Sequence, residues 1–270
     1  MSGMFGFDIL DNPALGIFWG SDGVEEKEDE TVPKNHFSIV AVSANVPGGH
    51  NDELSIDGPQ RAVVCIEVFD QAKVDIAGMN EFSSMFVPIW QRSNEYALRV
   101  APWNTINRVS NGNALVTRES HSQVLDIHIV PYRLAGRARP IHQIVALLRH
   151  VPSGSLYVVI IMHIPSRGDA STAQRTELNR ILIAIADKCA AAGLPVIPIG
   201  DRNGTIGLWP ARYDRAGFPP DYINWRGKGI ELRNSRSITR VAGKITDHNG
   251  FSRARLVVPT NTLKLSRLPI

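Results

Sequence analysis

Fold and function are both decided by the stretch Pro195-Val-Ile-Pro-Ile-Gly-Asp-Arg-Asn-Gly204. Its apolar residues form a run of strand length, and Gly200 ends that run abruptly. Asp201 and Asn203 follow two positions apart, and side chains at i and i+2 leave a strand on the same side. The same residues would also suit an ordinary Asp-x-Asn-Gly turn. The rest of the chain favours a carboxylate and a carboxamide presented together at a strand end.

The composition is that of a folded protein. The chain of 270 residues is long enough for one large domain or two small ones, and its 43% hydrophobic content excludes global disorder. No apolar run reaches the roughly 20 residues needed to cross a bilayer, and the acidic N-terminus is unlike a secretory signal. Cys65 and Cys189 lie in apolar helical patterns, which are typical of buried free thiols. We therefore expect an intracellular, cytoplasmic protein.

Charge divides the chain into unequal parts. Residues 1–30 hold eight Asp and Glu against one Lys, and the remainder holds 28 Lys and Arg against 18 Asp and Glu. A basic body favours a polyanionic partner such as nucleic acid, although charge also serves solubility. We expect an N-terminal extension and acidic linker over 1–35, a domain over 36–258 and a mobile tail over 259–270.

Several expected strands end in polar residues. Between 96 and 161, short strands separated by turns indicate an antiparallel or mixed sheet, and the pattern over 170–192 predicts a long helix. The polar residues at strand ends are Asn45, Glu81, His163, Asp201 with Asn203, and Asp247 with His248. Loops at one edge of a sheet would gather these side chains into one site.

This set of side chains suits metal-assisted hydrolysis. Carboxylates with an amide favour a hard, oxygen-liganded cation, for which Mg²⁺ is the first choice and Mn²⁺ an alternative. The two cysteines have no partners at zinc spacing. Histidines beside a metal and carboxylates suit an in-line attack of water on phosphorus, because that reaction needs a base, charge stabilisation and help for the leaving oxygen.

The residues and their order resemble the endonuclease/exonuclease/phosphatase superfamily, from about Phe37 to Val258. The matching blocks are Ser-Ala-Asn45, Asp75-Ile-Ala-Gly-Met-Asn-Glu81, Gly112-Asn-Ala-Leu-Val-Thr-Arg118, Met162-His163-Ile-Pro-Ser, Gly200-Asp-Arg-Asn203, Asp221-Tyr-Ile223 and Thr246-Asp-His248. The resemblance implies an α+β fold, a two-layered β-sandwich flanked by helices. This is the deoxyribonuclease I-like four-layer α/β sandwich.

The resemblance also implies a metal site and a base. Glu81 would be the principal metal ligand, with Asn45 and Asp247 completing the site, partly through water. Asp201 would orient and deprotonate the attacking water. Asn203 would hold that water or a phosphate oxygen.

Two histidines receive roles from the same resemblance. His248 would stabilise the charge of the transition state, with Asp221 fixing its tautomer and orientation. His163 would contact the phosphate or assist the leaving group. The sequence departs from the family's usual residues at three positions, each next to a candidate site residue: Asn80, Arg202 and Thr246.

The substrate is less well indicated. Between Arg202 and Lys244, nine Lys and Arg and three Asp and Glu are interleaved with five aromatic residues: Trp209, Tyr213, Phe218, Tyr222 and Trp225. Such a tract could track a phosphate backbone and stack on bases, or its aromatic residues could cover the core. Our hypothesis is a metal-dependent phosphodiesterase, a nuclease acting on nucleic acid. The alternatives are a phosphatase or lipid phosphodiesterase of the same superfamily, or a non-catalytic nucleic-acid-binding module; the sequence indicates no protein partner.

Overall fold

The computed structural model describes residues 31–47, 58–102, 104–106, 109–137, 139–204, 209–210, 212–218, 220–238, 246, 248 and 250–270. From Val32 onward these residues belong to one compact unit, Val32–Ile270. Residues 1–30 of the expected N-terminal extension and the expected metal ligand Asp247 lie outside the described residues.

One sheet of the unit has seven strands. Its order is β12 (Glu231–Ile238), β13 (Phe251–Pro259), β1 (His36–Asn45), β2 (Ile76–Ser83), β5 (Val109–Arg118) and β3 (Tyr96–Val100), and β4 (Asn104–Ile106) also pairs with β5. β1 and β2 are parallel. The other pairs are antiparallel, so the sheet is mixed.

The second sheet has six strands. Its order is β10 (Asp214–Phe218), β11 (Asp221–Trp225), β9 (Val196–Asp201), β8 (Leu156–His163), β7 (Ile141–His150) and β6 (Ser122–Tyr132). Only the pair β8 and β9 is parallel among these strands. This parallel pair is joined by a helix, as parallel neighbours require.

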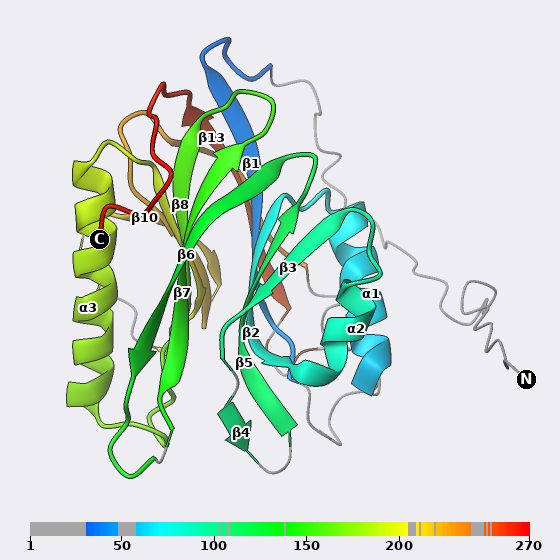
Figure 1. Ribbon diagram of the computed structural model, residues 1–270, viewed down its shortest axis with the longest axis vertical. Coiled ribbons are helices and arrows are strands. Elements are labelled where there is room, and N and C mark those ends of the chain that lie inside the picture. Colours follow the sequence, from blue (N-terminus) through cyan, green and yellow to red (C-terminus); the bar gives the residue numbers. More distant parts are fainter. Residues whose placement is uncertain are drawn as a thin grey trace, which may run out of the picture. The chain divides into compact units, whose positions relative to one another are not determined.

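Helices cover the two outer faces of the sheets (Figure 1). α1 (Gly58–Gln71), the 3₁₀ turn η2 (Ser84–Phe86) and α2 (Val87–Trp90) lie against the seven-stranded sheet, and α3 (Thr172–Ala191) lies against the six-stranded one. α3 begins with a capping box, in which Ser171 and Gln174 satisfy each other's backbone N–H groups. The expected α+β sandwich of two sheets flanked by helices is confirmed.

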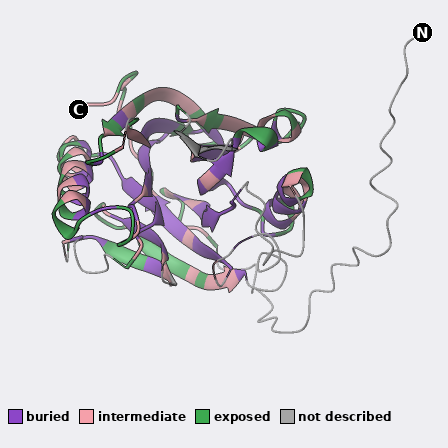
Figure 2. Ribbon diagram, turned by 90° about the horizontal axis from the view of Figure 1, so that it is seen from below, coloured by how far each residue is buried: buried purple, intermediate pink, exposed green. Residues whose placement is uncertain are grey.

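Three apolar clusters hold these layers together. The middle cluster lies between the sheets and includes Ile39, Ile161 and Ile199, whereas the outer clusters lie beneath the helices and include Phe69 and Leu182. Figure 2 shows the strands mostly buried and the outer side of α3 exposed. Strands buried on both faces explain why the sequence shows continuous apolar runs rather than strict alternation.

The two parallel strand pairs position the site. Asn45 at the end of β1 is in register with Asn80 of β2, and His163 at the end of β8 is in register with Asp201 of β9. Because parallel strands end at the same edge of a sheet, each pair delivers its polar residues side by side. β1 and β9 are neighbours across the sandwich, so the two edges meet.

The C-terminal residues differ from the expected mobile tail. Leu263, Leu265 and Leu268 pack against the cluster beneath α3, and the Leu268 backbone N–H donates to Asp126 Oδ2 at 2.8 Å. The tail is therefore a strap on the six-stranded sheet. Cys65 and Cys189 are buried free thiols, as expected. Within the described part of the chain, no helix combines the length and apolar character needed to span a membrane.

Candidate active site

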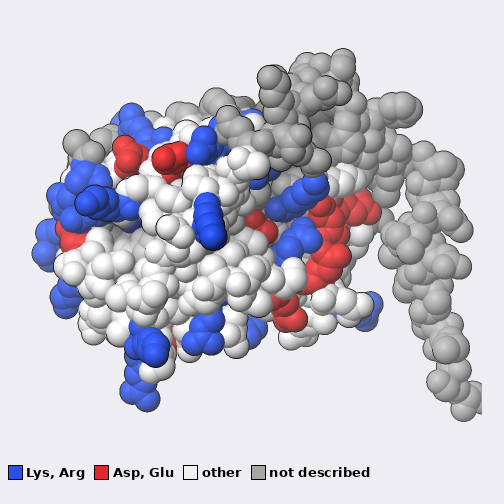
Figure 3. Space-filling model, turned by 90° about the horizontal axis from the view of Figure 1, so that it is seen from above, with Lys and Arg blue, Asp and Glu red and all other residues white. Residues whose placement is uncertain are grey.

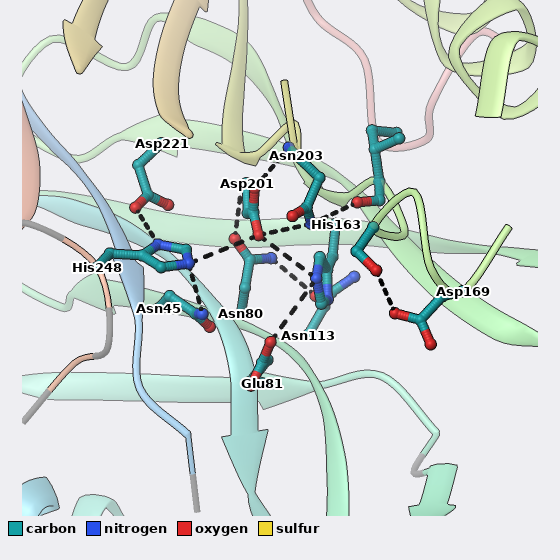
Figure 4. A network of polar contacts seen from close by, with 12 residues as sticks. Asn45, Asn80, Glu81, Asn113, His163, Asp169, Asp201, Asn203, Asp221 and His248 are labelled. Carbon is teal, nitrogen blue, oxygen red and sulfur yellow. Dashed lines mark hydrogen bonds and ion pairs between the residues drawn. The ribbon is translucent and has the colours of Figure 1, made fainter. Parts of the chain in front are cut away.

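Asp201 ends β9 and lies at the centre of the polar network in Figure 4. The residue is 1% exposed, and its two carboxylate oxygens accept hydrogen bonds from Asn203, one from the backbone N–H at 2.7 Å and one from Nδ2 at 2.8 Å. Asn203 Nδ2 also donates to the carbonyl of Ile164 at 2.7 Å. Both interpretations of this stretch are therefore compatible: the Asp-x-Asn-Gly turn is present, and it orients the Asp201 carboxylate at the end of the strand.

The protonation of Asp201 is set by its surroundings. Burial raises its pKa to about 6, and the effect is opposed by His163, whose Nε2 lies 3.5 Å from Asp201 Oδ2. Asp221 adds to the rise, whereas Asn203 and His248 lower the pKa. A carboxylate with a pKa near neutrality can accept a proton and release it again, which is what a general base does.

His248 is oriented by a carboxylate behind it. Its Nδ1 lies 2.6 Å from Asp221 Oδ2, and since a carboxylate only accepts, Nδ1 carries the proton. In the neutral ring Nε2 is then the acceptor, which agrees with the Asn45 Nδ2 donor 3.1 Å away. Ser43 Oγ donates to the other oxygen of Asp221 at 3.1 Å. The dyad therefore presents Nε2 towards Asp201, 3.9 Å from its Oδ2.

A β-bulge brings two consecutive residues of β2 to the site. The pairing of β2 with β5 passes from Met79 opposite Ala114 directly to Phe82 opposite Gly112, and Glu81 has a φ of 53°. In a regular strand, Asn80 and Glu81 would point to opposite faces. The bulge turns Glu81 so that its Oε1 lies 4.0 Å from His163 Nε2, next to Asp201.

A chain of buried carboxamides lies beneath the catalytic candidates. Asn80 Oδ1 accepts the Asp201 backbone N–H at 2.8 Å, and Asn80 Nδ2 donates to Asn113 Oδ1 at 2.8 Å. Asn113 Nδ2 donates to Gln143 Oε1 at 3.0 Å, and Gln143 bonds both backbone groups of His163. These three amides join β2, β5 and β7, and they hold Asp201 and His163 at a fixed separation.

The catalytic candidates open into a pocket of about 340 Å³. Its inner wall is formed by Glu81, His163, Asp201, Asn203 and His248. Asn45 and Asp221 lie behind this wall, and each contacts a ring nitrogen of His248. The structure therefore gathers seven of the eight side chains that the sequence singled out, and the eighth, Asp247, lies outside the described residues.

Solved structures show the same architecture. No family model and no curated protein matches the chain in sequence. The catalytic domain of human Nocturnin is similar with a TM-score of 0.66 at 15% identity, over 83% of this chain and 95% of that one. An endonuclease/exonuclease/phosphatase protein from Bacteroides vulgatus is similar with a TM-score of 0.65 at 12% identity, over 82% and 98%. D. rerio TDP2 complexed with a single-strand DNA product has a TM-score of 0.61 at 16% identity, over 83% and 99%.

The chain has the endonuclease/exonuclease/phosphatase fold. At these identities the likeness establishes the fold, and the roles of individual residues rest on the geometry of the site. Within this fold, the candidate site residues lie at or near the ends of β1, β2, β8, β9 and β11.

Oxygen donors gather on one side of the pocket. The carboxylates of Glu81 and Asp201 and the amide of Asn45 are ligands that suit a hard cation such as Mg²⁺. Among the residues that the structure describes, no three His, Cys, Asp or Glu side chains are grouped closely enough to hold a metal by themselves. A cation here would therefore take amide and water oxygens into its shell, with Asp247 as the remaining candidate from the sequence.

The aromatic tract has a structural role. Trp209, Tyr213, Tyr222 and Trp225 are each at most 7% exposed, and Trp209 and Tyr213 pack in the cluster beneath α3. Arg212 and Arg226 are both tied to Asp187 of α3. Of the two interpretations of this tract, the structure favours the one in which the aromatic residues cover the core.

Asn113 and Gln143 were missed by the sequence interpretation. The local sequence of β5 and β7 does not mark Asn113 and Gln143 as special. Their hydrogen-bond partners lie on other strands, so their role becomes visible only in the folded structure. The only available signal was Asn113 next to Gly112 in the matched block.

We expect Asn113→Leu to lower the free energy of unfolding by about 1–3 kcal/mol, since it leaves buried polar partners on Asn80 and Gln143 unsatisfied. The matched control is Thr117→Val on the same strand. Among the described residues, the buried Thr117 Oγ1 has no hydrogen-bond partner, so its removal should be neutral or stabilising. Urea denaturation of both variants is the measurement. Equal effects of the two substitutions would contradict a role for the amide chain.

Proposed function

We propose that the protein is a metal-dependent phosphodiesterase and that its substrate is nucleic acid. The observation that carries the proposal is the convergence of Asp201, His163 and the Asp221-oriented His248 on one pocket, with Glu81 beside them. A base, two imidazoles and a cluster of oxygen donors are the groups that hydrolysis of a phosphate ester requires.

Each residue has a step that its geometry permits. Asp201 Oδ2 takes the proton from the attacking water, and Asn203 Nδ2, 2.8 Å from that oxygen, positions the carboxylate for this transfer. His248 stabilises the charge on the phosphate through Nε2 once that nitrogen is protonated, because Asp221 keeps the other nitrogen as a donor. His163 faces the same space from β8 and assists the leaving oxygen.

Mg²⁺ fits the oxygen donors described above, and when bound it would supply positive charge beside the phosphate oxygens. Glu81 is its principal ligand in this proposal, with Asn45 and Asp247 as further ligands. The bulge in β2 supports this role. The positive φ of Glu81 is a strained backbone conformation, and such conformations are concentrated at functional sites, where a side chain must point in an unusual direction.

Nucleic acid is favoured over other phosphate esters by two observations. The chain beyond residue 30 carries a surplus of Lys and Arg, and the similar TDP2 structure contains a single-strand DNA product. The cations are not gathered at one place on the end seen in Figure 3, where Lys and Arg lie mainly along the edge of a broad uncharged area.

The test is hydrolysis with and without Mg²⁺ on labelled single- and double-stranded DNA, RNA, an abasic duplex, an inositol phosphate and sphingomyelin. We expect metal-dependent cleavage of at least one nucleic acid and slower turnover of the other two substrates. Preference for the inositol phosphate or for sphingomyelin would contradict a nucleic-acid substrate and would favour a phosphatase or a lipid phosphodiesterase instead. Binding of nucleic acid without any turnover would indicate a non-catalytic module.

Replacing Glu81 by glutamine tests the metal site separately. Glu81→Gln keeps the shape of the side chain but removes its charge, so the variant should need a higher Mg²⁺ concentration, and excess Mg²⁺ should restore part of its rate. Rates measured against Mg²⁺ concentration, with calorimetry of Mg²⁺ binding, check this. A variant that binds Mg²⁺ as the unaltered protein does would remove Glu81 from the metal site.

A further inference from the structure

The pocket continues beyond the catalytic residues. In the six-stranded sheet the order β11, β9, β8, β7, β6 places the Asp221–His248 dyad on one side of Asp201 and the loop between β6 and β7 on the other. The outer half of the pocket lies on that other side and is lined by Pro102, Leu134, Arg137, Ile141 and His142. A group attached to the phosphate on the His163 side would enter this half.

The walls of the outer half are apolar and fixed. Leu134 is 1% exposed, and Pro102 and Ile141 face the same space. His142 Nδ1 lies 3.0 Å from the Pro102 carbonyl, and since a carbonyl only accepts, this nitrogen donates. That bond joins β7 of one sheet to the segment after β3 of the other and closes the end of the pocket. Apolar side chains of this kind suit contact with an aromatic ring.

Arg137 is the cation of the outer half. It pairs through Nη2 with Asp169, and Asp169 is in turn held by the Ser166 hydroxyl at 2.7 Å (Figure 4). The ion pair is partly exposed, 34% for Arg137 and 47% for Asp169, so it contributes little to stability. The guanidinium has five N–H donors in a planar fork, of which this contact uses one end. Asp169 therefore orients Arg137 and leaves the fork able to bind an anion.

We propose that the outer half of the pocket is a subsite for a nucleotide unit, with its ring against the apolar walls and a second phosphate, next to the scissile one, on Arg137. This rests on the proposed function, because it assigns the substrate class of the same site. The volume of about 340 Å³ covers both halves of the pocket and is at the lower end of small-molecule sites, which limits the outer half to a single unit at the end of a strand.

Three thymidine dinucleotides test the subsite: one with a 5′-terminal phosphate, one with a 3′-terminal phosphate and one with hydroxyls at both ends. The variants are Arg137→Gln and, as a matched control, Arg133→Gln, which removes the same charge from an exposed position on the same loop outside the pocket lining. Thermal melting of both checks that they fold.

The protein is expected to favour one of the phosphate-bearing dinucleotides about tenfold or more in kcat/KM, mainly through KM. Arg137→Gln should reduce this preference to near one, and Arg133→Gln should retain it. A preference that survives in Arg137→Gln, or an unaltered protein without preference, would overturn the subsite while leaving the proposed function intact.

Equilibrium binding of the same dinucleotides in EDTA, followed by calorimetry, separates the two proposals. Weaker binding of the phosphate-bearing dinucleotide to Arg137→Gln, in a protein that hydrolyses nothing, would keep the subsite and remove the phosphodiesterase. Absence of both binding and hydrolysis for every dinucleotide would overturn the subsite, and an apolar ligand would then have to be sought for its walls.

Discussion

Asp201→Asn is expected to lower the rate of phosphodiester hydrolysis by at least about 10²–10⁴-fold and, at the same time, to stabilise the folded domain at neutral pH. The loss of rate follows from the loss of the base, since the amide cannot accept the proton of water. The gain in stability follows from burial, which raises the pKa of Asp201 to about 6.

The sign of the stability effect is set by this raised pKa. A carboxyl group with a higher pKa in the folded than in the unfolded chain favours folding while it is protonated, and this contribution is lost as pH rises through about 6. The shift from 3.8 to about 6 corresponds to about 3 kcal/mol of lost stability above that pH. The amide avoids this loss but gives up one hydrogen bond from Asn203, worth about 1 kcal/mol. The net gain is therefore about 2 kcal/mol.

Chemical denaturation of the metal-free protein at several pH values measures this gain. The variant should be more stable than the unaltered protein at about pH 8, and the difference should shrink towards about pH 4. Asp214→Asn, at an exposed position, is the control and should change neither rate nor pH dependence. Full activity in Asp201→Asn, or a stability difference that grows as pH falls, would remove Asp201 from the role of buried base.

Gly200→Ala is expected to destabilise the domain by more than about 4 kcal/mol or to prevent folding. A Cβ atom at Gly200 would lie 1.9 Å from the carbonyl oxygen of Met162, and the φ of Gly200 is 143°, which side chains rarely adopt. Relief would require β8 and β9 to separate where Met162 pairs with Gly200. The same carbonyl accepts from Asn80 Nδ2, so the site would be disturbed with the sheet.

The matched control is Gly154→Ala in the turn between β7 and β8. Gly154 also has a positive φ, 72°, but a Cβ atom there would meet nothing within 4 Å. Only the backbone strain remains, about 1–2 kcal/mol. Soluble yield and urea denaturation distinguish the two substitutions. Similar stabilities of the two variants would mean that β8 and β9 are not as closely paired as described.

The sequence predicted the parts of this fold that depend on local patterns. The buried strands ending at Asn45, His163 and Asp201 were found because each is a continuous apolar run followed by a polar residue. The candidate site residues were then selected by their order along the chain. How far apart their side chains lie could not be predicted, because those distances depend on the register of β8 with β9 and on the packing of two sheets.

Other elements gave no local signal. β10 has the sequence Asp-Arg-Ala-Gly-Phe over Asp214–Phe218, which is polar enough to resemble a loop and is a strand because it pairs with β11. The tail was expected to be mobile because it is weakly basic; Leu263, Leu265 and Leu268 nevertheless pack on the domain. Pro88 lies in the first turn of α2, where a missing N–H is tolerated.

The bulge in β2 separates two kinds of constraint within one strand. On one side of it, Ile76 to Met79 keep their register with β5, and on the other side Phe82 and Ser83 resume it. Asn80 and Glu81 lie between these two anchored segments. The partly exposed side chain of Glu81 can therefore be exchanged without repacking the layers, whereas gaining or losing a single residue in the bulge would rotate this position out of the pocket. In β2, the number of residues between the two anchored segments sets the direction of Glu81, whereas the types of the anchored residues set the packing of the layers.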